Sequence, residues 1–506
     1  MNADSAELLR QAEVLHGQGQ RLEAIALFRQ ALALHPESSE GWYELGYLLK
    51  AESQYEAALE AYAEALARGI ARPEEVHLNR AVIYSDHLRR DEAAEQELKT
   101  ALALAPGYHS AWLNLGNLHE ERGQREAALE CYDKILADPG ALDRASMDLR
   151  MEALSRSANL RPPTTGDDPV FAKLQAAASQ PAGKMARANV YFALGQARDR
   201  LGQYELAFEA YAKANRWLLR QSGKAYDRAH MVQLTSALIE TFSDAAAEPL
   251  SAAPSGPEPL FICGMFRSGS TLLEQVLAAH PQVMAGGELN WLRQLATERL
   301  SPFPASMSKP DVDRDVALAA EYRAHLARLF PVASADAGVV NKYISDKRPD
   351  NFLLIGLIKQ LFPSARIIHT TRNPLDNGLS IFMQHLHLQV AGYSADLGDI
   401  GHYYAQYRRL MAHWQSLYAD SIFTFDYDAF VREPKPTLMR LLEFLQLPWD
   451  DRCLEFHRLR NTVKTGSYWQ VRQPLHGKAS GRWHHYEAHV ADLQNMLREN
   501  GIIEPL

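Results

Sequence analysis

The first half of this chain repeats one pattern of residues with a period of about 34 positions. Two blocks, starting at Trp42 and Trp112, share Trp, Leu, Gly, Ala, Tyr and an apolar residue at identical offsets. Two other blocks keep the small and large positions of this template and end at Pro36 and Pro106, and a fifth copy starts at Tyr191. One such unit cannot bury its apolar face alone, so the units must stack on one another. The chain is therefore constrained to begin as an all-α solenoid.

This pattern resembles the tetratricopeptide repeat (TPR), whose unit is a pair of antiparallel helices. Small residues stand where the two helices touch, large residues fill the gap to the next repeat, and proline ends the second helix. An insertion from Asp143 to Lys184 interrupts the array. It is expected to be helical at both ends and to form an exposed loop from Arg161, because RPPTTGDDP cannot continue a helix. A last helix is expected from Ala225 to Ala246.

Residues 248–259 read EPLSAAPSGPEP, which has no periodicity and is typical of a linker. This segment is expected to divide a TPR solenoid at 1–247 from a second domain at 260–506. In the second domain short apolar runs alternate with helical stretches, which predicts an α/β three-layer fold with a central parallel sheet. Ligands of such sheets bind at the carboxyl ends of the strands. The expected strands are Leu260–Cys263, Arg366–Thr370 and Ile422–Phe425.

The first expected strand is followed by residues that predict a phosphate-binding loop. Gly264, Gly269, Ser270 and Thr271 reproduce the spacing of the P-loop, and a helical pattern begins at Ser270. The backbone N–H groups of such a loop and the positive end of the helix dipole favour an anion. Ser270 stands where a P-loop nucleoside triphosphatase has lysine, and Arg267 lies inside the loop, so chemistry on the γ-phosphate of ATP is disfavoured.

A second anion signal follows the expected strand that ends at Thr370. Arg372 leaves the strand end, and Ser380 lies eight positions later in a helix that begins near Pro374. Both side chains are expected to reach a phosphate that lies across the strand ends, with the guanidinium as a bidentate donor. The alternative is that Arg372 caps a loop or pairs with Asp376.

Together these motifs resemble the two nucleotide-binding motifs of sulfotransferases that use 3′-phosphoadenosine 5′-phosphosulfate (PAPS). The similarity is closest to protein-tyrosine sulfotransferases and to bacterial sulfotransferases with TPR arrays. The resemblance implies that Arg267 and the backbone amides of Ser268, Gly269, Ser270 and Thr271 hold the 5′-phosphosulfate. It also implies that the 3′-phosphate is held by Arg372 and Ser380, that the product 3′-phosphoadenosine 5′-phosphate (PAP) leaves, and that no metal is required.

The resemblance assigns further roles by position. Glu288 stands where the protein-tyrosine enzymes have their catalytic base, although their arginine two residues later is Asn290 here. Lys347 matches a lysine beside the transferring sulfuryl group, with Lys342 as a nearby competitor. Tyr427 matches an aromatic residue that packs on the adenine, and the alternative is a core tyrosine at a strand end.

The segment after Val463 resembles the closing loop of these enzymes. Ser467 and Lys478 are expected to contact the nucleotide, and Gly481 and Trp483 belong to the same similarity. Two histidines in the loop after Ser380 are alternative bases, because some soluble sulfotransferases use histidine in this role. They are His385 and His387.

Composition limits the remaining classes of function. A formal net charge of −9 argues against a general nucleic-acid-binding protein, although a local basic pocket is compatible with it. Three widely spaced cysteines are too few for a disulfide framework or a zinc site. The first residues lack the layout of a signal peptide, and no apolar run reaches the roughly 20 residues of a membrane span. A cytoplasmic protein is therefore expected.

The resemblance implies a PAPS-dependent sulfotransferase. Its TPR array is expected to recruit a protein or peptide at the concave face, with the acceptor itself as one such partner. The sequence does not distinguish whether the acceptor hydroxyl belongs to tyrosine, a sugar, a lipid or a small phenol. It does not determine the oligomeric state either. One alternative is a TPR scaffold protein whose P-loop-like domain binds a nucleotide without catalysis. Another is a P-loop kinase, which Ser270 opposes.

Overall fold

The computed structural model divides the chain into two compact units. The first contains residues 1–120 and 124–153, and the second contains residues 121–123 and 154–506. The structure describes residues 3–138, 143–180, 182–223, 225–244, 257–309, 311–331, 341–388, 390–465 and 468–504.

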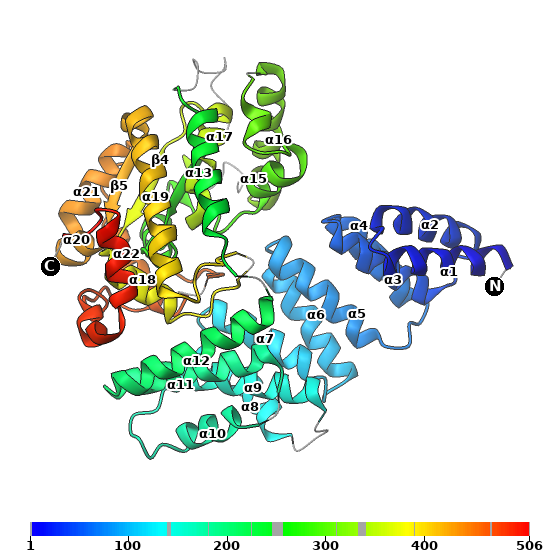
Figure 1. Cartoon of the computed structure of the whole chain (residues 1–506). Coiled ribbons are helices and arrows are strands. Elements are labelled where there is room, and N and C mark those ends of the chain that lie inside the picture. Colours follow the sequence, from blue (N-terminus) through cyan, green and yellow to red (C-terminus); the bar gives the residue numbers. More distant parts are fainter. Residues whose placement is uncertain are drawn as a thin grey trace. The chain divides into compact units, whose positions relative to one another are not determined.

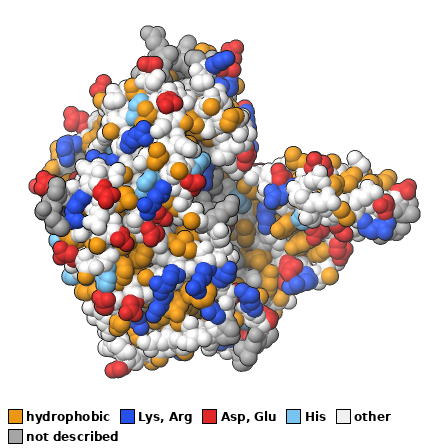
Figure 2. All heavy atoms as spheres, viewed as in Figure 1, with side chains coloured by type: hydrophobic (Ala, Val, Ile, Leu, Met, Phe, Trp, Pro, Cys, Tyr) orange, Lys and Arg blue, Asp and Glu red, His pale blue; other side chains and the backbone are white. Residues whose placement is uncertain are grey.

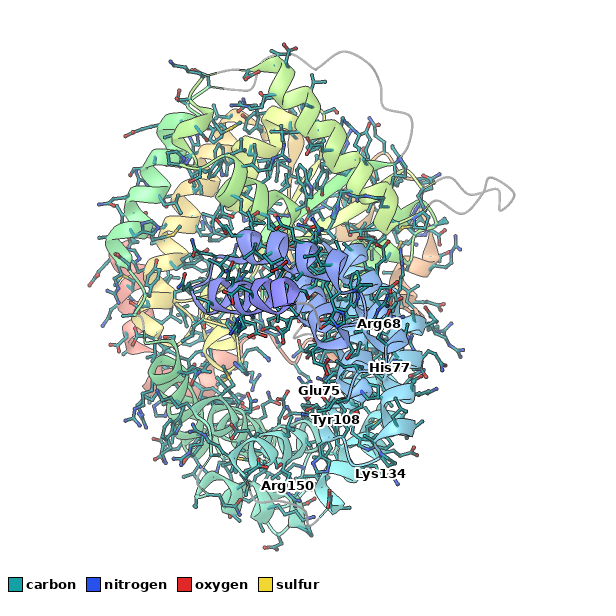
Figure 3. All side chains as sticks on the ribbon, turned by 90° about the vertical axis from the view of Figure 1, so that its right-hand side faces the viewer. Arg68, Glu75, His77, Tyr108, Lys134 and Arg150 are labelled. Carbon is teal, nitrogen blue, oxygen red and sulfur yellow. The ribbon has the colours of Figure 1, made fainter. Side chains whose placement is uncertain are left out.

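The first unit is a stack of helix pairs, as the repeats predict. Its helices are α1 (Ala3–Gly17), α2 (Arg21–Leu34), α3 (Ser39–Ala51), α4 (Tyr55–Ala67), α5 (Pro73–Val82) with the π-helical turn η1 (Ile83–His87), α6 (Asp91–Leu104), α7 (His109–Glu121) and α8 (Arg125–Ala137). Figure 3 shows labelled side chains that follow one another along these repeats, from Arg68 to Lys134, and then Arg150 in the helix after α8. The expectation of an N-terminal TPR array is therefore confirmed.

A glycine in the first helix of a repeat receives the ring of a tyrosine in the second helix. Adding a Cβ atom to the glycine would bring it within 3 Å of that ring, so only glycine permits the close approach of the two helices. The pairs are Gly46 with Tyr62, Gly116 with Tyr132 and Gly195 with Tyr211, at 2.8, 2.5 and 2.6 Å.

The repeat tryptophans have a common role as well. Trp42 Nε1 donates a hydrogen bond to the carbonyl of Pro36 at 2.8 Å, and Trp112 Nε1 donates to the carbonyl of Pro106 at 2.9 Å. Each indole therefore ties the first helix of its repeat to the proline that ends the preceding repeat.

The second unit starts within α9 (Arg144–Leu160), which is followed by α10 (Pro169–Ala178). The expected break lies between these helices, and Asp168 caps α10 by accepting a hydrogen bond from the Val170 amide. The fifth repeat forms α11 (Lys184–Arg200) and α12 (Tyr204–Ser222), which lie side by side in Figure 1, and α13 (Arg228–Thr241) follows. Most of the expected linker at 248–259 falls outside the described residues, and β1 begins at Glu258.

A five-stranded parallel sheet lies at the centre of the second unit. The strand order is β2 (Val283–Met284), β3 (Tyr343–Lys347), β1 (Glu258–Gly264), β4 (Ile367–Thr371) and β5 (Ile422–Asp426). The chain leaves the central strand to one side for β2 and β3 and returns to the other side for β4. The switch point at the end of β1 is where ligands of doubly wound sheets bind.

Alternating residues of β1 enter two separate cores. Phe261 and Cys263 pack in one core with helical residues such as Leu357 and Tyr407, whereas Leu260 and Ile262 pack in the other with helical residues such as Leu273 and Leu441. The three-layer α/β prediction is therefore confirmed. The helices are α14 (Ser270–Ala278), α15 (Trp291–Gln294), α16 (Val312–Leu329), α17 (Ile355–Leu361), α18 (Pro374–Phe382), α19 (Leu397–Leu417), α20 (Tyr427–Arg432), α21 (Pro434–Phe444) and α22 (Ala491–Glu499).

The surface carries no single dominant charge on the visible face. Acidic and basic side chains are both spread over the face shown in Figure 2. No helix among the described residues combines the length and apolar character that a membrane span requires.

The helices that end the repeat array pack into the core of the α/β domain. Asn215 on α12 is buried, and its Nδ2 donates to the carbonyl of Phe382 at 2.8 Å. Phe208 stacks on the Phe382 ring at 5.3 Å. Phe242, directly after α13, lies against Gly356 in α17. The fifth repeat thus shares one hydrophobic core with the domain that follows it.

We predict that Gly356→Ala destabilises the protein, because the added Cβ would lie 2.4 Å from the Phe242 ring. Overpacking of this kind costs about 1–3 kcal/mol of unfolding free energy. The control is the same substitution in a Phe242→Ala background, where the ring is absent and the cost should largely disappear. Urea unfolding of the four proteins measures the difference. An equal cost in both backgrounds would contradict the packing described.

Candidate functional site

A cavity of about 570 Å³ lies at the carboxyl edge of the sheet, and residues that follow each of the five strands line it. These residues are Phe266 after β1, Glu288 after β2, Pro349 after β3, Arg372 after β4 and Tyr427 after β5. Residues of the C-terminal segment between 464 and 482 close the cavity. The predicted site residues Arg267, Gly269, Ser270, Thr271, Ser380 and Lys478 line it as well.

The loop between β1 and α14 has the backbone that a phosphate-binding loop requires. Gly264, Arg267 and Gly269 have φ values of +150°, +67° and +99°. A Cβ atom on Gly264 would lie 2.4 Å from the carbonyl oxygen of Thr370, so the tight turn excludes every other residue. Gly269 caps α14, whose first-turn N–H groups have no partner within the helix.

Ser268 does not face the cavity. Its hydroxyl donates to the Met265 carbonyl at 2.7 Å and shares a hydrogen bond of 2.6 Å with the hydroxyl of Thr370. Its amide donates to the same Met265 carbonyl at 3.2 Å. The predicted donation by the Ser268 amide would require this turn to open, whereas the amides of Gly269, Ser270 and Thr271 begin the helix.

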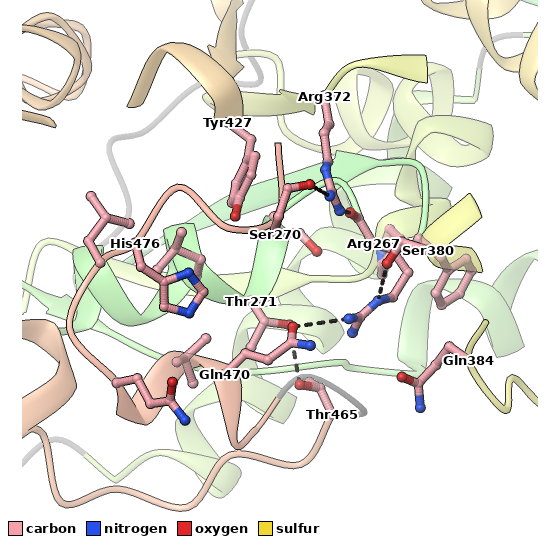
Figure 4. A pocket seen from close by; sticks show the side chains of 18 of the residues that line it. Arg267, Ser270, Thr271, Arg372, Ser380, Gln384, Tyr427, Thr465, Gln470 and His476 are labelled. Atoms are coloured by element: carbon pink, nitrogen blue, oxygen red, sulfur yellow. Dashed lines mark hydrogen bonds between the residues drawn. The ribbon is translucent and has the colours of Figure 1, made fainter. Parts of the chain in front are cut away.

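Arg267 and Ser380 meet across the cavity, as Figure 4 shows. Arg267 Nε donates to Ser380 Oγ at 3.2 Å, and its terminal nitrogen donates to Gln470 Oε1 at 3.0 Å. Thr271 Oγ1 donates to Thr465 Oγ1 at 3.2 Å. The phosphate loop is therefore linked both to α18 and to the C-terminal segment.

Arg372 lies beside the same loop. Its guanidinium donates to the carbonyls of Arg267, at 3.2 Å, and of Ala479, and its centre lies 5.1 Å from the centroid of the Tyr427 ring. Its Nε is buried and has no hydrogen-bond partner among the described residues. Arg372 and Asp376 form no ion pair within the described residues. The Asp376 carboxylate instead accepts hydrogen bonds from the amides of Gly481 and Trp483.

Positive charge is concentrated in this cavity. Burial, followed by the nearby charges of Arg372 and Arg482, lowers the pKa of Arg267 to about 10. Burial also lowers the pKa of Arg372, and Arg482 contributes in the same direction. Each guanidinium would be stabilised by an anion placed between them. The electrostatics therefore favour a ligand with several negative charges.

Glu288 lines the cavity and forms an ion pair with Lys347, which is not among the residues that line it. Lys347 Nζ donates to Glu288 Oε1 at 2.7 Å, and the lysine side chain is fully buried while that of Glu288 is 32% exposed. The Lys347 amide donates to the carbonyl of Gly287 at 2.9 Å, which fixes the loop beside β3. Lys342 lies at the other end of β3, where its Nζ donates to the carbonyls of Leu445 and Gln446.

Asn290 contacts a guanidinium group, that of Arg348. Its Oδ1 accepts a hydrogen bond from Arg348, which Asp350 fixes through two bonds of 2.9 and 3.0 Å. The Arg348 guanidinium is therefore held beside Asn290.

The other predicted residues are distributed differently. Tyr427 packs against Gly269, where a Cβ would lie 2.7 Å from the ring. Ser467 lies outside the described residues. His385 stacks on Phe192 of α11 at 5.7 Å. Neither His385 nor His387 is among the residues that line the cavity.

Several residues of the site were missed by sequence reasoning. Glu274 on α14 is buried, and its Oε1 accepts hydrogen bonds from the Gly287 amide and the Ser345 hydroxyl, which holds the loop that carries Glu288. Arg482 and Asp199 both line the cavity, although they lie 283 positions apart in the chain. The TPR template gives Asp199 no special position, so no local signal marked it.

Comparison with known proteins agrees with this architecture. Residues 259–451 match the sulfotransferase family, and residues 9–75, 78–141 and 188–217 match tetratricopeptide repeats. An uncharacterized protein of Aquifex aeolicus is 34% identical over 62% of this chain and 42% of its own length. Protein-tyrosine sulfotransferase 1 of Danio rerio is 25% identical over 44% of this chain and 65% of its own length. The alignments thus span less than two thirds of either relative.

Among solved structures, the sulfotransferase domain of the Synechococcus PCC 7002 olefin synthase aligns over 51% of this chain and 100% of its own length. The identity is 19% and the TM-score is 0.36.

The pH dependence of stability is predicted to reflect Asp346, the buried neighbour of Lys347 on β3. Its carboxylate accepts hydrogen bonds from Tyr322, at 2.7 Å, and from Asn351, but burial raises its pKa to about 6. Because the unfolded pKa is about 3.9, the folded state holds this proton more tightly, and stability falls as the pH rises from about 4 to about 6. The loss amounts to about 3 kcal/mol.

We therefore expect Asp346→Asn, which can keep both hydrogen bonds, to have a higher melting temperature than the wild type at pH 8 and no such advantage at pH 4. Thermal unfolding at both pH values measures this. Equal differences at pH 4 and pH 8 would show that Asp346 does not titrate in this range.

Proposed function

We propose that this chain, which has TPR repeats followed by a sulfotransferase-family domain, transfers a sulfuryl group from PAPS to an acceptor hydroxyl. The observation that carries the proposal is the convergence of Arg267, Arg372 and Ser380 at the N-terminus of α14. In that cavity the Nε of Arg372 is buried without a hydrogen-bond partner among the described residues. A nucleotide with both a 3′-phosphate and a 5′-phosphosulfate would supply the missing anions.

The cavity fits such a nucleotide in size and in chemistry. Its volume of about 570 Å³ is in the range of small-molecule sites, which is about 300–1,000 Å³. Arg267 and the amides of Gly269 to Thr271 would bind the 5′-phosphosulfate, and Arg372 with Ser380 would bind the 3′-phosphate. Tyr427 would face the adenine, and Lys478 would contribute further positive charge. The contact of Ser467 with the nucleotide stays a prediction, because this residue lies outside the described residues. PAPS supplies a sulfuryl group that is already activated for transfer.

The transfer requires two tasks of the protein. The bond between sulfur and the 5′-phosphate oxygen breaks as a bond forms between sulfur and the acceptor oxygen, so negative charge builds on the leaving phosphate. Arg267, Lys347 and the loop amides would stabilise this charge. The acceptor proton would pass to the carboxylate of Glu288. The ion pair with Lys347 would orient that carboxylate, and PAP would then leave.

The acceptor is proposed to be a hydroxyl on a protein or peptide recruited by the TPR array, with tyrosine as the first candidate. The name of the Danio rerio relative supports tyrosine, and the contact between Arg348 and Asn290 places a guanidinium beside the position that differs. A sulfate adduct found by mass spectrometry, after PAPS is added to a cell extract with the protein, would identify the acceptor.

The first prediction of this proposal concerns ligand choice. PAP should raise the melting temperature in the presence of EDTA, because both phosphates meet arginine, while ATP with Mg²⁺ should do so much less. A PAP concentration about 100-fold above the Kd should stabilise the protein by about 2.7 kcal/mol. Equal stabilisation by PAP and ATP would rule out the proposed donor.

Arg372→Ala should weaken the binding of PAP by roughly 10- to 150-fold and leave the binding of adenosine 5′-monophosphate nearly unchanged.

The second prediction concerns the base. Glu288→Gln keeps the shape and the hydrogen bond to Lys347 but cannot accept a proton, so turnover should fall at least about 100-fold while PAP affinity is retained. Its melting temperature should fall, since the buried Lys347 loses its counter-charge. The matched control is Asp315→Asn, a buried and ion-paired carboxylate on α16 outside the cavity lining, which should keep turnover within about 10-fold of the wild type. Turnover of Glu288→Gln within a few-fold of the wild type would remove Glu288 from the mechanism.

A further inference from the structure

One wall of the donor cavity is formed by residues 478–482, and the 3-10 helix η9 (Arg482–His489) continues from it. On the sheet side the wall is fixed by Asp376, which accepts hydrogen bonds from the Gly481 and Trp483 amides, and by Asp428, which accepts one from Ser480. On its other side η9 packs against the fifth TPR repeat. The wall is thus held from two directions.

The contacts to the fifth repeat follow the whole of η9. Tyr204 stacks on His485 at 4.4 Å, and Phe208 stacks on His489 at 4.3 Å. His489 Nε2 also lies 2.7 Å from a carboxylate oxygen of Glu205. These residues of α12 leave η9 little freedom to move as a unit.

Asp199, at the end of α11, makes the contact that reaches the cavity itself. Its Oδ2 accepts a hydrogen bond from the Arg482 guanidinium, and its Oδ1 accepts one from the Tyr486 hydroxyl. The Asp199 side chain is 14% exposed and that of Arg482 is 35% exposed. Both residues line the donor cavity, so this ion pair faces the space that the nucleotide would occupy.

A carboxylate in an anion-binding cavity opposes the ligand unless it has a second role. Arg482 lies close enough to Arg267 and Arg372 for its charge to affect both guanidiniums. Repulsion among the three cations would drive the long Arg482 side chain toward solvent when no anion is bound. Asp199 offsets this repulsion and fixes the guanidinium at the cavity.

We infer that Asp199 is a positioning residue of the donor site, which holds the Arg482 guanidinium toward the bound nucleotide. The fifth TPR repeat therefore contributes a residue to this site. The inference rests on the proposed PAPS chemistry. It gives the TPR array a role beyond partner recruitment, because an element of the repeat fold sets the position of a cation at the site of transfer.

The test compares nucleotide binding by full-length variants. Asp199→Asn should weaken PAP by about 5- to 20-fold, because the Arg482 side chain must then be ordered by the ligand, and should leave adenosine, which has no phosphate, unchanged. In turnover, the KM for PAPS should rise more than kcat falls. Asp199→Glu, which restores the carboxylate, should recover part of the PAP affinity. Tyr486→Phe is the matched control, since it removes the other hydrogen bond to Asp199 and should leave PAP affinity within about 2-fold of the wild type.

A cycle with Arg482→Ala separates positioning from general damage. If Asp199 acts through Arg482, adding Asp199→Asn to Arg482→Ala should cause no further loss of PAP affinity. Unchanged or tighter PAP binding by Asp199→Asn would overturn the inference and show that Asp199 is only an opposing charge. Equal losses for PAP and adenosine would show a structural role instead. A wild-type protein that fails to bind PAP would contradict the proposed function itself, which is a different outcome from either of these.

Discussion

Two partly buried guanidinium groups, those of Arg267 and Arg372, stand side by side at the carboxyl edge of the sheet, and the rest of the site is arranged around them. Burial, followed by the nearby charges of Arg372 and Arg482, lowers the pKa of Arg267 to about 10, so this arrangement is unfavourable in the free protein. The fold holds them there through hydrogen bonds to neutral groups, namely Ser380, Gln470 and the carbonyl of Ala479. These neutral partners fix the geometry of both guanidinium groups, and an anion between them would be stabilised by both charges.

The backbone beneath these groups explains how two arginines reach the same place. The parallel register places Gly264 beside Thr370, so the loops after β1 and β4 leave the sheet at the same level. The left-handed turn at Arg267 directs the first arginine toward α18, and Arg372 donates to the carbonyl of that same residue. The C-terminal segment then closes over both, fixed by Asp376 and by the fifth repeat. The donor cavity therefore depends on three stretches that are far apart in the chain.

The parts of the fold and the site that could be predicted from the sequence are those that leave a pattern in neighbouring residues. The repeat helices and the turn at Gly264 follow from close packing and backbone strain, and both leave a recognisable spacing. The strand β3 was missed, because Tyr343–Lys347 is polar in three of its five positions and carries Ser345 and Asp346 inward. The pairing of Lys347 with Glu288 and of Arg482 with Asp199 depends on tertiary contacts over 59 and 283 positions, which no spacing rule records.

The central claim is that one cavity binds both phosphates of a 3′-phosphorylated adenine nucleotide. A crystal structure of the full chain with PAP tests it most directly. The account predicts the 5′-phosphate at the amides of Gly269 to Thr271 beside Arg267, and the 3′-phosphate within hydrogen-bond distance of Arg372 and Ser380. It also predicts that Arg372 Nε, which has no partner among the described residues, gains one. A nucleotide bound elsewhere, or bound here with its 3′-phosphate in solvent, would contradict the account.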